Sequence, residues 1–236
     1  MTAHAADYTW TAQRYPILGE AYCLAQVQGL DAEELLRRYD ALPAGSVVGL
    51  DAVLAAWDAY EEGEDEDDDD YEDEDEDEDG EGPGEAAAQS DPTEDRIFVA
   101  VTELDGWAIA VEPYGYLGTL WEVIPRLAEG TRLVSHYRNV NAADTFDWWE
   151  HGSCRLHFEP LFPDDRHGSD ADAPGIPELM THCGFHLDTE DHELCTEAAF
   201  ALAERLTDVR LSPERLEAAT FLLGYAPRPV SPSAQS

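Results

Sequence analysis

The chain has 236 residues, of which 43% are hydrophobic and 10% aromatic, and this composition excludes a wholly disordered polymer. The formal net charge is −40, because 53 acidic residues face only 13 basic ones. Such an excess of carboxylates repels nucleic acids and anionic membranes, so both are excluded as partners and a basic protein is favoured.

The N-terminal part of the chain is predicted to be helical. Residues 16–30, PILGEAYCLAQVQGL, place their apolar members at helical spacing. Asp31 then caps a second helix over residues 32–40, with Glu34 three positions later as in a capping box. A third helix is predicted over residues 50–60.

A strongly acidic segment follows the third helix. Between residues 61 and 81 only Gly63, Tyr71 and Gly80 are not acidic. Adjacent like charges repel one another and keep such a segment extended. We interpret residues 61–95 as a disordered acidic insertion that serves as a solvated tether. The alternatives are an arm that binds a partner and a loose Ca²⁺ or Mn²⁺ site.

From residue 96 the apolar pattern changes to the period of two that is typical of strands. IFVAVTEL, the dipeptide Asp105-Gly106 and WAIAVEP predict a β-hairpin. A helix at residues 119–129 and a strand in TRLVSHYRNVN follow. TFDWWE, a turn at His151-Gly152 and CRLHFEP predict a second hairpin.

The C-terminal part is again predicted to be helical. A polar loop after Pro163 leads to a short helix around residues 177–182 and a longer one at 196–207. A last helix begins after Ser212, which is a favoured N-cap residue, and ends at Gly224.

These elements predict an α+β fold with one mostly antiparallel five-stranded sheet. Helices from both termini would pack on one face of that sheet. We expect residues 1–225 to form a single domain interrupted by the insertion at 61–95, because neither half closes a core alone. Residues 226–236 are rich in proline and serine and are predicted to be a flexible tail.

Five stretches outside the acidic insertion carry a family resemblance: DYTWTAQRYP, ELDGWAIAVEPYGYLG, VSHYRNVNAADTF, LHFEPLFPD and TEAAFALAERLTDVRLSPERLEAATFLLG. They resemble an uncharacterised family of actinobacterial proteins, defined as a domain of unknown function. The resemblance implies a bacterial cytoplasmic protein, and it brings no activity and no catalytic residue.

Polar residues at strand ends are the candidate catalytic set. Glu112 and Glu159 each precede a proline, which favours extended geometry and places both carboxylates at strand ends. Such a pair could carry out acid–base chemistry. A second polar cluster suits a small binding pocket and consists of His136, Arg138, Asn139 and Asn141. The alternative is that all these groups are solvated or satisfy their own loops.

Four residues near the C-terminus have the spacing of metal ligands: Cys183, His186, His192 and Cys195. Zinc accepts such nitrogen and sulfur ligands. The linking segment is short, and apolar residues interleave with the candidate ligands as they would in a core. We therefore expect no cofactor, with zinc as the alternative. The four cysteines of the chain are scattered, which is typical of reduced thiols in a cytoplasmic protein.

Aromatic residues suggest a contact surface. Trp148 and Trp149 are consecutive in a predicted strand, so one of them should point outward, near Tyr114 and Tyr116. No nucleotide-binding or hydrolase motif is present. We therefore expect a non-enzymatic interaction module of adaptor or immunity type that binds a basic partner. The alternative is a small-molecule-binding or hydrolytic domain that uses the strand-end carboxylates with the His136–Arg138 cluster.

Overall fold

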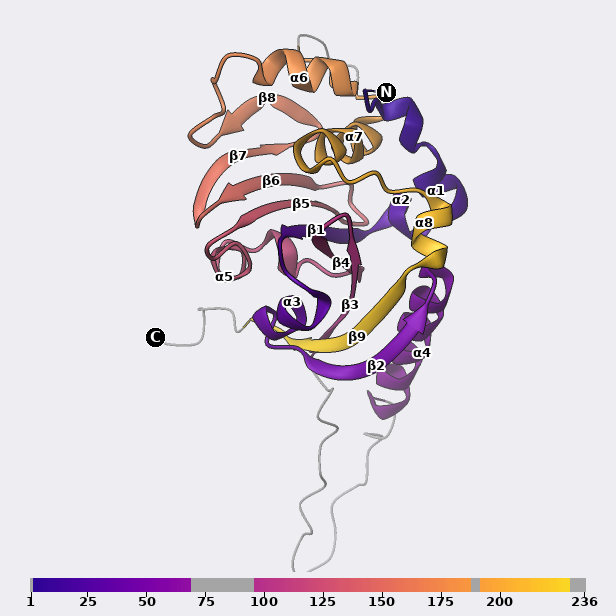
Figure 1. Cartoon of the computed structure of the whole chain (residues 1–236). Coiled ribbons are helices and arrows are strands. Elements are labelled where there is room, and N and C mark those ends of the chain that lie inside the picture. Colours follow the sequence, from indigo (N-terminus) through magenta and orange to yellow (C-terminus); the bar gives the residue numbers. More distant parts are fainter. Residues whose placement is uncertain (1, 69–95, 188–191, 230–236) are drawn as a thin grey trace, which may run out of the picture.

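Nine antiparallel strands form one continuous sheet in the described part of the chain. The structure, a computed structural model, describes residues 2–68, 96–187 and 192–229, except for the side chains of 63–68. The strands are β1 (Tyr22–Gln28), β2 (Leu42–Val48), β3 (Arg96–Leu104), β4 (Trp107–Pro113), β5 (Arg132–Arg138), β6 (Asp144–Glu150), β7 (Ser153–Glu159), β8 (Phe162–His167) and β9 (Thr220–Pro227). Their order is β2-β9-β3-β4-β1-β5-β6-β7-β8 (Figure 1). The α+β class is confirmed, whereas the prediction of five strands is wrong.

Two of the additional strands lie where the sequence predicts helices. β1 occupies the middle of the sheet and falls inside the predicted helix at 16–30. β9 replaces the end of the predicted helix that stops at Gly224. In β1, all residues but the last are buried. A strand buried on both faces loses the alternation of apolar and polar residues, so periodicity alone does not separate it from a buried helix.

The helices predicted at 32–40, around 177–182 and at 196–207 are confirmed, whereas others differ in length from the sequence prediction. The described helices are η1 (Ala5–Tyr8), α1 (Trp10–Arg14), α2 (Ile17–Glu20), α3 (Ala32–Arg38), α4 (Leu50–Asp68), η2 (Leu117–Thr119), α5 (Ile124–Leu127), α6 (Ile176–Cys183), α7 (Cys195–Thr207) and α8 (Pro213–Ala218). The predicted helix at 119–129 is reduced to α5, and α4 runs past its predicted end. The remainder of the acidic insertion, 69–95, and the tail from 230 lie outside the described residues.

Both predicted hairpins are confirmed. The turn between β3 and β4 places Asp105 and Gly106 at φ of 52° and 81°, and the turn between β6 and β7 places His151 and Gly152 at 50° and 77°. Two consecutive residues with positive φ are typical of a type I′ turn, whose twist matches that of the flanking strands.

Helices cover both faces of the sheet, so the prediction of one covered face is wrong. On the first face, Leu24 of β1 shares a core with Phe200 of α7. On the second face, Val27 of β1 shares a core with Leu36 of α3 and Leu127 of α5. In Figure 1, α7 lies above β1 and β5, and α3 and α5 lie below them.

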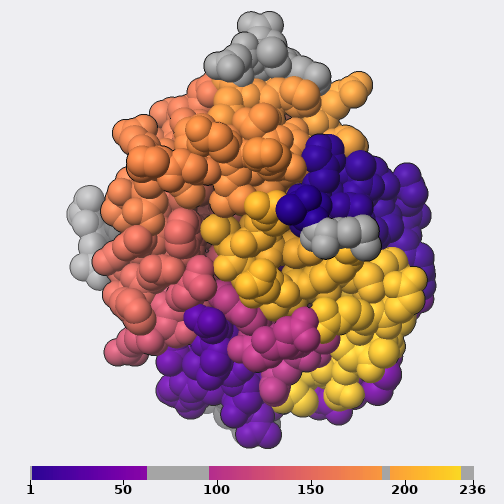
Figure 2. All heavy atoms as spheres, turned by 45° about the horizontal axis from the view of Figure 1, so that its top comes forward, coloured from indigo at the N-terminus to yellow at the C-terminus, as the bar shows by residue number. Residues whose placement is uncertain are grey.

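The two ends of the described chain pack together on the first face. Figure 2 shows the indigo N-terminal segment beside the yellow C-terminal segment. Tyr8 donates to Glu204 Oε2 at 2.6 Å, and Tyr15 donates to Glu217 Oε1 at 2.5 Å. Within the described residues, no helix combines the length and the apolar character that crossing a membrane requires.

Candidate functional site

An open groove of about 780 Å³ lies where α3 begins, beside the end of β3. Three segments that are distant in the sequence form it: the start of α3, the end of β3, and α8 with the first part of β9. Its carboxylates are those of Asp31, Glu33 and Glu103, and its apolar residues include Leu104 and Leu222.

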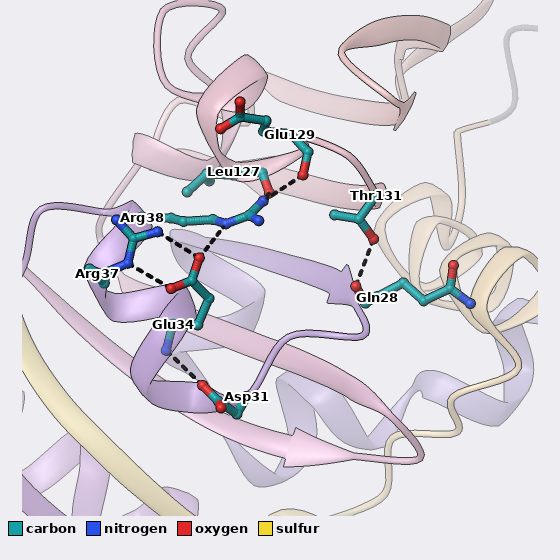
Figure 3. Close-up of polar contacts among 8 residues, drawn as sticks. All are labelled: Gln28, Asp31, Glu34, Arg37, Arg38, Leu127, Glu129 and Thr131. Atoms are coloured by element: carbon teal, nitrogen blue, oxygen red, sulfur yellow. Dashed lines mark hydrogen bonds and ion pairs between the residues drawn. The ribbon is translucent and has the colours of Figure 1, made fainter.

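The start of α3 is fixed by its own side chains. Asp31 Oδ1 accepts from the backbone N–H of Glu34 at 2.8 Å, which confirms Asp31 as the N-cap. The carboxylate of Glu34 binds Arg37 and Arg38, and Arg38 Nη1 donates to the carbonyls of Leu127 and Glu129, both at 2.9 Å (Figure 3). This ties α3 to α5 and holds the acidic start of α3 beside the groove.

Glu103 approaches the same helix from the sheet. Its Oε1 accepts from the backbone N–H of Ala32 at 3.0 Å, in the first turn of α3. Asp31 and Glu103 therefore place negative charge beside the backbone N–H groups of the first turn, which have no acceptor within the helix. The helix dipole favours a negative charge at this position. Glu33 lies two residues after Asp31 and is exposed to solvent.

The opposite wall of the groove supplies apolar surface and one paired cation. Arg215 Nη2 lies 2.8 Å from Asp105 Oδ2, and Arg215 Nη1 donates to the carbonyl of Arg210. The three carboxylates of the groove therefore outweigh its single arginine. Leu104 and Leu222 are half-buried. Such a lining suits a lysine or arginine side chain, whose apolar stem packs while its charged end meets carboxylates.

Glu112 and His136, two members of the predicted catalytic set, lie on opposite faces of the sheet. Glu112 is paired with Cys23 across β4 and β1, whereas His136 is paired with Leu24, the next residue of β1. Successive residues of a strand point to opposite faces. The structure therefore does not bring the two side chains together.

Glu112 is completely buried. Its carboxylate accepts from Tyr39 Oη at 3.0 Å and from the backbone N–H groups of Leu117 and Gly118 at 2.7 and 3.0 Å. Burial raises the pKa of Glu112 to about 7, although these hydrogen bonds lower it. Burial, followed by the charge of Glu112, also raises the pKa of the Cys23 thiol well above its usual value. This cluster joins η2 to the sheet and has no access to solvent.

His136 and Arg138 are also engaged within the protein. His136 Nδ1 lies 2.9 Å from Tyr22 Oη, and burial lowers the pKa of His136 to about 3, so the ring is neutral. Arg138 Nη1 donates to both oxygens of Asp144 at 3.1 and 2.9 Å and to Thr196. Burial raises the pKa of Asp144 to about 6 despite this partner.

The other predicted polar residues lie near the surface. Asn139 Oδ1 accepts from the backbone N–H groups of Asn141 and Ala143 at 2.9 and 3.0 Å, so Asn139 satisfies its own loop. Glu159 is half-buried at the end of β7 and is paired with Phe162 of β8.

The aromatic residues are arranged differently from the predicted patch. Trp149 is buried and Trp148 half-buried. Tyr114 is 42% exposed and stacks on Trp57 with ring centroids 5.1 Å apart, whereas Tyr116 is half-buried.

Trp121 is the most exposed tryptophan of the described chain, at 55%. It lies edge-on against Trp149 and His157, with ring centroids 5.2 and 5.5 Å apart. The sequence analysis places Trp121 inside the predicted helix at 119–129. The presence of a tryptophan shortly before Pro125 was the one sequence signal for an exposed aromatic residue there.

A buried aspartate beneath Trp121 was also missed. Asp147 Oδ1 accepts from Trp149 Nε1 at 3.2 Å and lies 2.9 Å from His157 Nδ1. The hydrogen bond to Asp147 raises the pKa of His157 above its usual value. Thr119 Oγ1 lies 3.5 Å from Asp147 Oδ2, so η2 reaches this carboxylate as well.

Of the four predicted metal ligands, Cys183 lies buried outside the crevice that the other three line. Cys183 is completely buried, which raises the pKa of its thiol to about 12. Cys195 Sγ lies 4.0 Å from Asp144 Oδ2, and the His192 ring lies against Phe162. His186, His192 and Cys195 line one small crevice. Residues 188–191 of the linking segment lie outside the described residues. Within the described ranges, no group of three or more histidine, cysteine or carboxylate side chains is arranged to hold a metal ion.

Comparison with known proteins identifies a family. The family model described as "Family of unknown function (DUF6461)" matches residues 1–230. The chain therefore belongs to this family, which confirms the resemblance to an uncharacterised domain. No curated protein and no solved structure matches the chain.

Proposed function

We propose that this member of the DUF6461 family is a non-enzymatic interaction module of adaptor or immunity type. Its groove binds a basic segment of a partner protein. The observation that carries the proposal is the lining of the groove, in which Asp31, Glu33 and Glu103 accompany the apolar side chains of Leu104 and Leu222. Lysine and arginine side chains in an amphipathic segment match that combination.

The distribution of charge across the molecule supports a basic partner. Most arginines of the described chain already lie within 4 Å of a carboxylate. These are Arg14, Arg37, Arg38, Arg126, Arg132, Arg138, Arg155, Arg166 and Arg215. Because acids outnumber bases by 53 to 13, the surface that remains for a partner is negative. Such a field accelerates the encounter with a basic partner.

The edge of the sheet beside the groove supports a partner in extended conformation. β2 is the terminal strand of the sheet, and its residues LPAGSVV carry no charge. Val48 of β2 is 63% exposed and is paired with Thr220, which lines the groove. An uncharged edge strand is a template for one further strand.

A pair of peptides tests the proposal. One labelled eight-residue peptide alternates lysine with leucine, and the other alternates lysine with serine at equal charge. The acidic insertion attracts both peptides alike, whereas the groove offers apolar contact to leucine alone. We expect the leucine peptide to bind about tenfold more tightly in fluorescence anisotropy, which corresponds to about 1.4 kcal/mol.

Matched charge variants locate the binding site. D31N/E33Q/E103Q removes three charges from the groove, and its side-chain oxygens still accept the hydrogen bonds at the start of α3. D58N/E129Q/D172N removes three exposed charges elsewhere. Only the groove variant should lose the preference for leucine. Equal binding of the two peptides by the wild type, or the same loss in both variants, contradicts the proposal.

A further inference from the structure

A second hollow, of about 610 Å³, lies on the first face of the sheet. Trp148 of β6 and Arg205 of α7 line it, together with the loop before α6 and the residues Ile176 and Leu179 of α6. Trp148 is flanked in the sheet by Val134 and Leu156, both members of the core of the first face. None of the residues that line this pocket lines the acidic groove.

Two nitrogen donors beside this pocket have no acceptor among the described residues. They are Trp148 Nε1 and Arg205 Nη1, and both atoms are buried. A buried donor without an acceptor has lost its hydrogen bond to water and gained none in return, which is unfavourable. Buried tryptophan N–H groups usually find a partner. Two such donors in residues that line one pocket indicate that an acceptor is supplied from outside the chain.

The surrounding charges define the sign of the missing acceptor. Arg132 and Arg155 lie over the Trp148 ring, with guanidinium carbons 5.9 and 5.8 Å from its centroid. Arg132 Nε lies 2.8 Å from a Glu150 oxygen, and Arg155 Nη2 lies 2.7 Å from an Asp170 oxygen, so carboxylates balance both. Arg205 has no ion pair within the described chain.

We propose that this pocket binds a small organic monoanion, a carboxylate on an aromatic or branched apolar body. The carboxylate would accept from Trp148 Nε1 and from the guanidinium of Arg205. The apolar body would pack against the Trp148 ring and the side chains of Ile176 and Leu179. A single negative charge matches the guanidinium of Arg205, and the carboxylates of Asp170 and Glu178, which also line the pocket, repel a dianion.

Binding is tested on the full-length protein with sodium benzoate at constant ionic strength. Benzamide serves as the neutral isostere. The chain is labelled with ¹⁵N, and the indole signal of Trp148 is assigned by its absence from W148F, which keeps an aromatic ring. We expect benzoate to shift this signal with saturation in the millimolar range, and benzamide to bind at least tenfold more weakly.

Arginine variants separate a specific site from general attraction of anions. R205M removes the guanidinium and keeps an apolar stem, so benzoate affinity should fall about tenfold or more. R210M changes an exposed arginine a short distance along the chain and should leave the affinity unchanged. Circular dichroism and thermal unfolding verify that both variants fold. The proposal is overturned if benzoate at 20 mM leaves the Trp148 signal in place, if benzamide shifts it equally, or if R205M and R210M bind alike.

Discussion

Glu112 and Asp147 are two fully buried carboxylates on the same face of one sheet, and different kinds of donor surround them. Glu112 is paired through Cys23 and Tyr137 with Thr145, which lies two residues from Asp147 in β6. Among the described residues, Glu112 accepts only from neutral donors. Asp147 has a donor that titrates, His157, whose side chain is 27% exposed.

The contrast shows how position in the sheet decides whether a carboxylate, as at Glu112, or a neighbouring imidazole, as at His157, has a raised pKa. At the closed centre, none of the described residues brings a cation to Glu112, and burial raises the pKa of the carboxylate itself to about 7. Nearer the edge of the sheet, His157 is partly exposed, and its hydrogen bond to Asp147 raises the pKa of the imidazole. The short helix η2 joins the two sites, because Leu117 and Gly118 donate to Glu112 and Thr119 approaches Asp147.

Removal of the Glu112 carboxylate should have the largest effect. E112A leaves two backbone N–H groups and the Tyr39 hydroxyl without an acceptor, and it opens a cavity. We expect a loss of about 4 kcal/mol in the free energy of unfolding, measured by urea denaturation at pH 7. E112Q keeps an acceptor oxygen and should lose less than half as much. A loss below about 1 kcal/mol in E112A contradicts the role of this cluster in joining η2 to the sheet.

The pH dependence of stability should distinguish the two carboxylates next. The pKa of Glu112 is raised on folding from 4.5 to about 7, so its protonated form favours the folded state. The resulting stabilisation is complete below pH 4.5 and is lost as pH rises through 7, with an amplitude of roughly 3 kcal/mol at about 1.4 kcal/mol per pKa unit.

E112Q isolates this contribution. Burial raises the pKa of Asp144 to about 6, so Asp144 also makes the free energy of unfolding fall as pH rises, in the wild type and in E112Q alike. Only the difference in unfolding free energy between these two proteins therefore reports on Glu112. That difference in unfolding free energy should vary between pH 4.5 and 7. Parallel stability curves for the two proteins would show that Glu112 does not titrate in this range.

The smallest expected effect belongs to the Asp147–His157 pair. D147N removes the charge that raises the pKa of His157, so that pKa should fall towards the ordinary value of 6.5, measured by NMR of the imidazole protons. The stabilisation from this pair is complete below pH 6.5 and is lost as pH rises through the folded-state pKa. Because His157 is partly exposed, we expect less than about 1 kcal/mol.

His167 is the control for this experiment. Its ring centroid lies 6.4 Å from that of His157, and its side chain is largely exposed. A larger shift for His167 than for His157 in D147N would argue against a direct effect of Asp147.

Turns and helix caps were predicted correctly from the sequence, whereas the burial of individual side chains was not. The hairpin at Asp105-Gly106 and the cap at Asp31 depend on residues that are adjacent in the chain, and both were predicted. Glu112 was predicted to lie at a strand end as part of a candidate catalytic pair, with a solvated strand end as the alternative. Its burial was missed because residues 16–30 were assigned to a helix. The strand β1 within that segment is the neighbour that buries Glu112.

The groove could not have been predicted for a related reason. Asp31 and Glu33 lie close together in the sequence, but Glu103 reaches them only through the pairing of the sheet. Leu222 belongs to β9, which the sequence pattern assigned to a helix. Because β9 packs against the cores on both faces of the sheet, its sequence lacks the alternation of apolar and polar residues that would have identified it as a strand.

The position of β9 also has a consequence for biosynthesis. β9 lies between β2 and β3, although it is the last of the nine described strands to be synthesised. Until residues 220–227 have left the exit tunnel, β2 has no partner and β3 is paired on one side only. The nascent chain therefore carries unpaired strand edges until β9 emerges, and the acidic residues between β2 and β3 in the sequence should repel neighbouring nascent chains during that time.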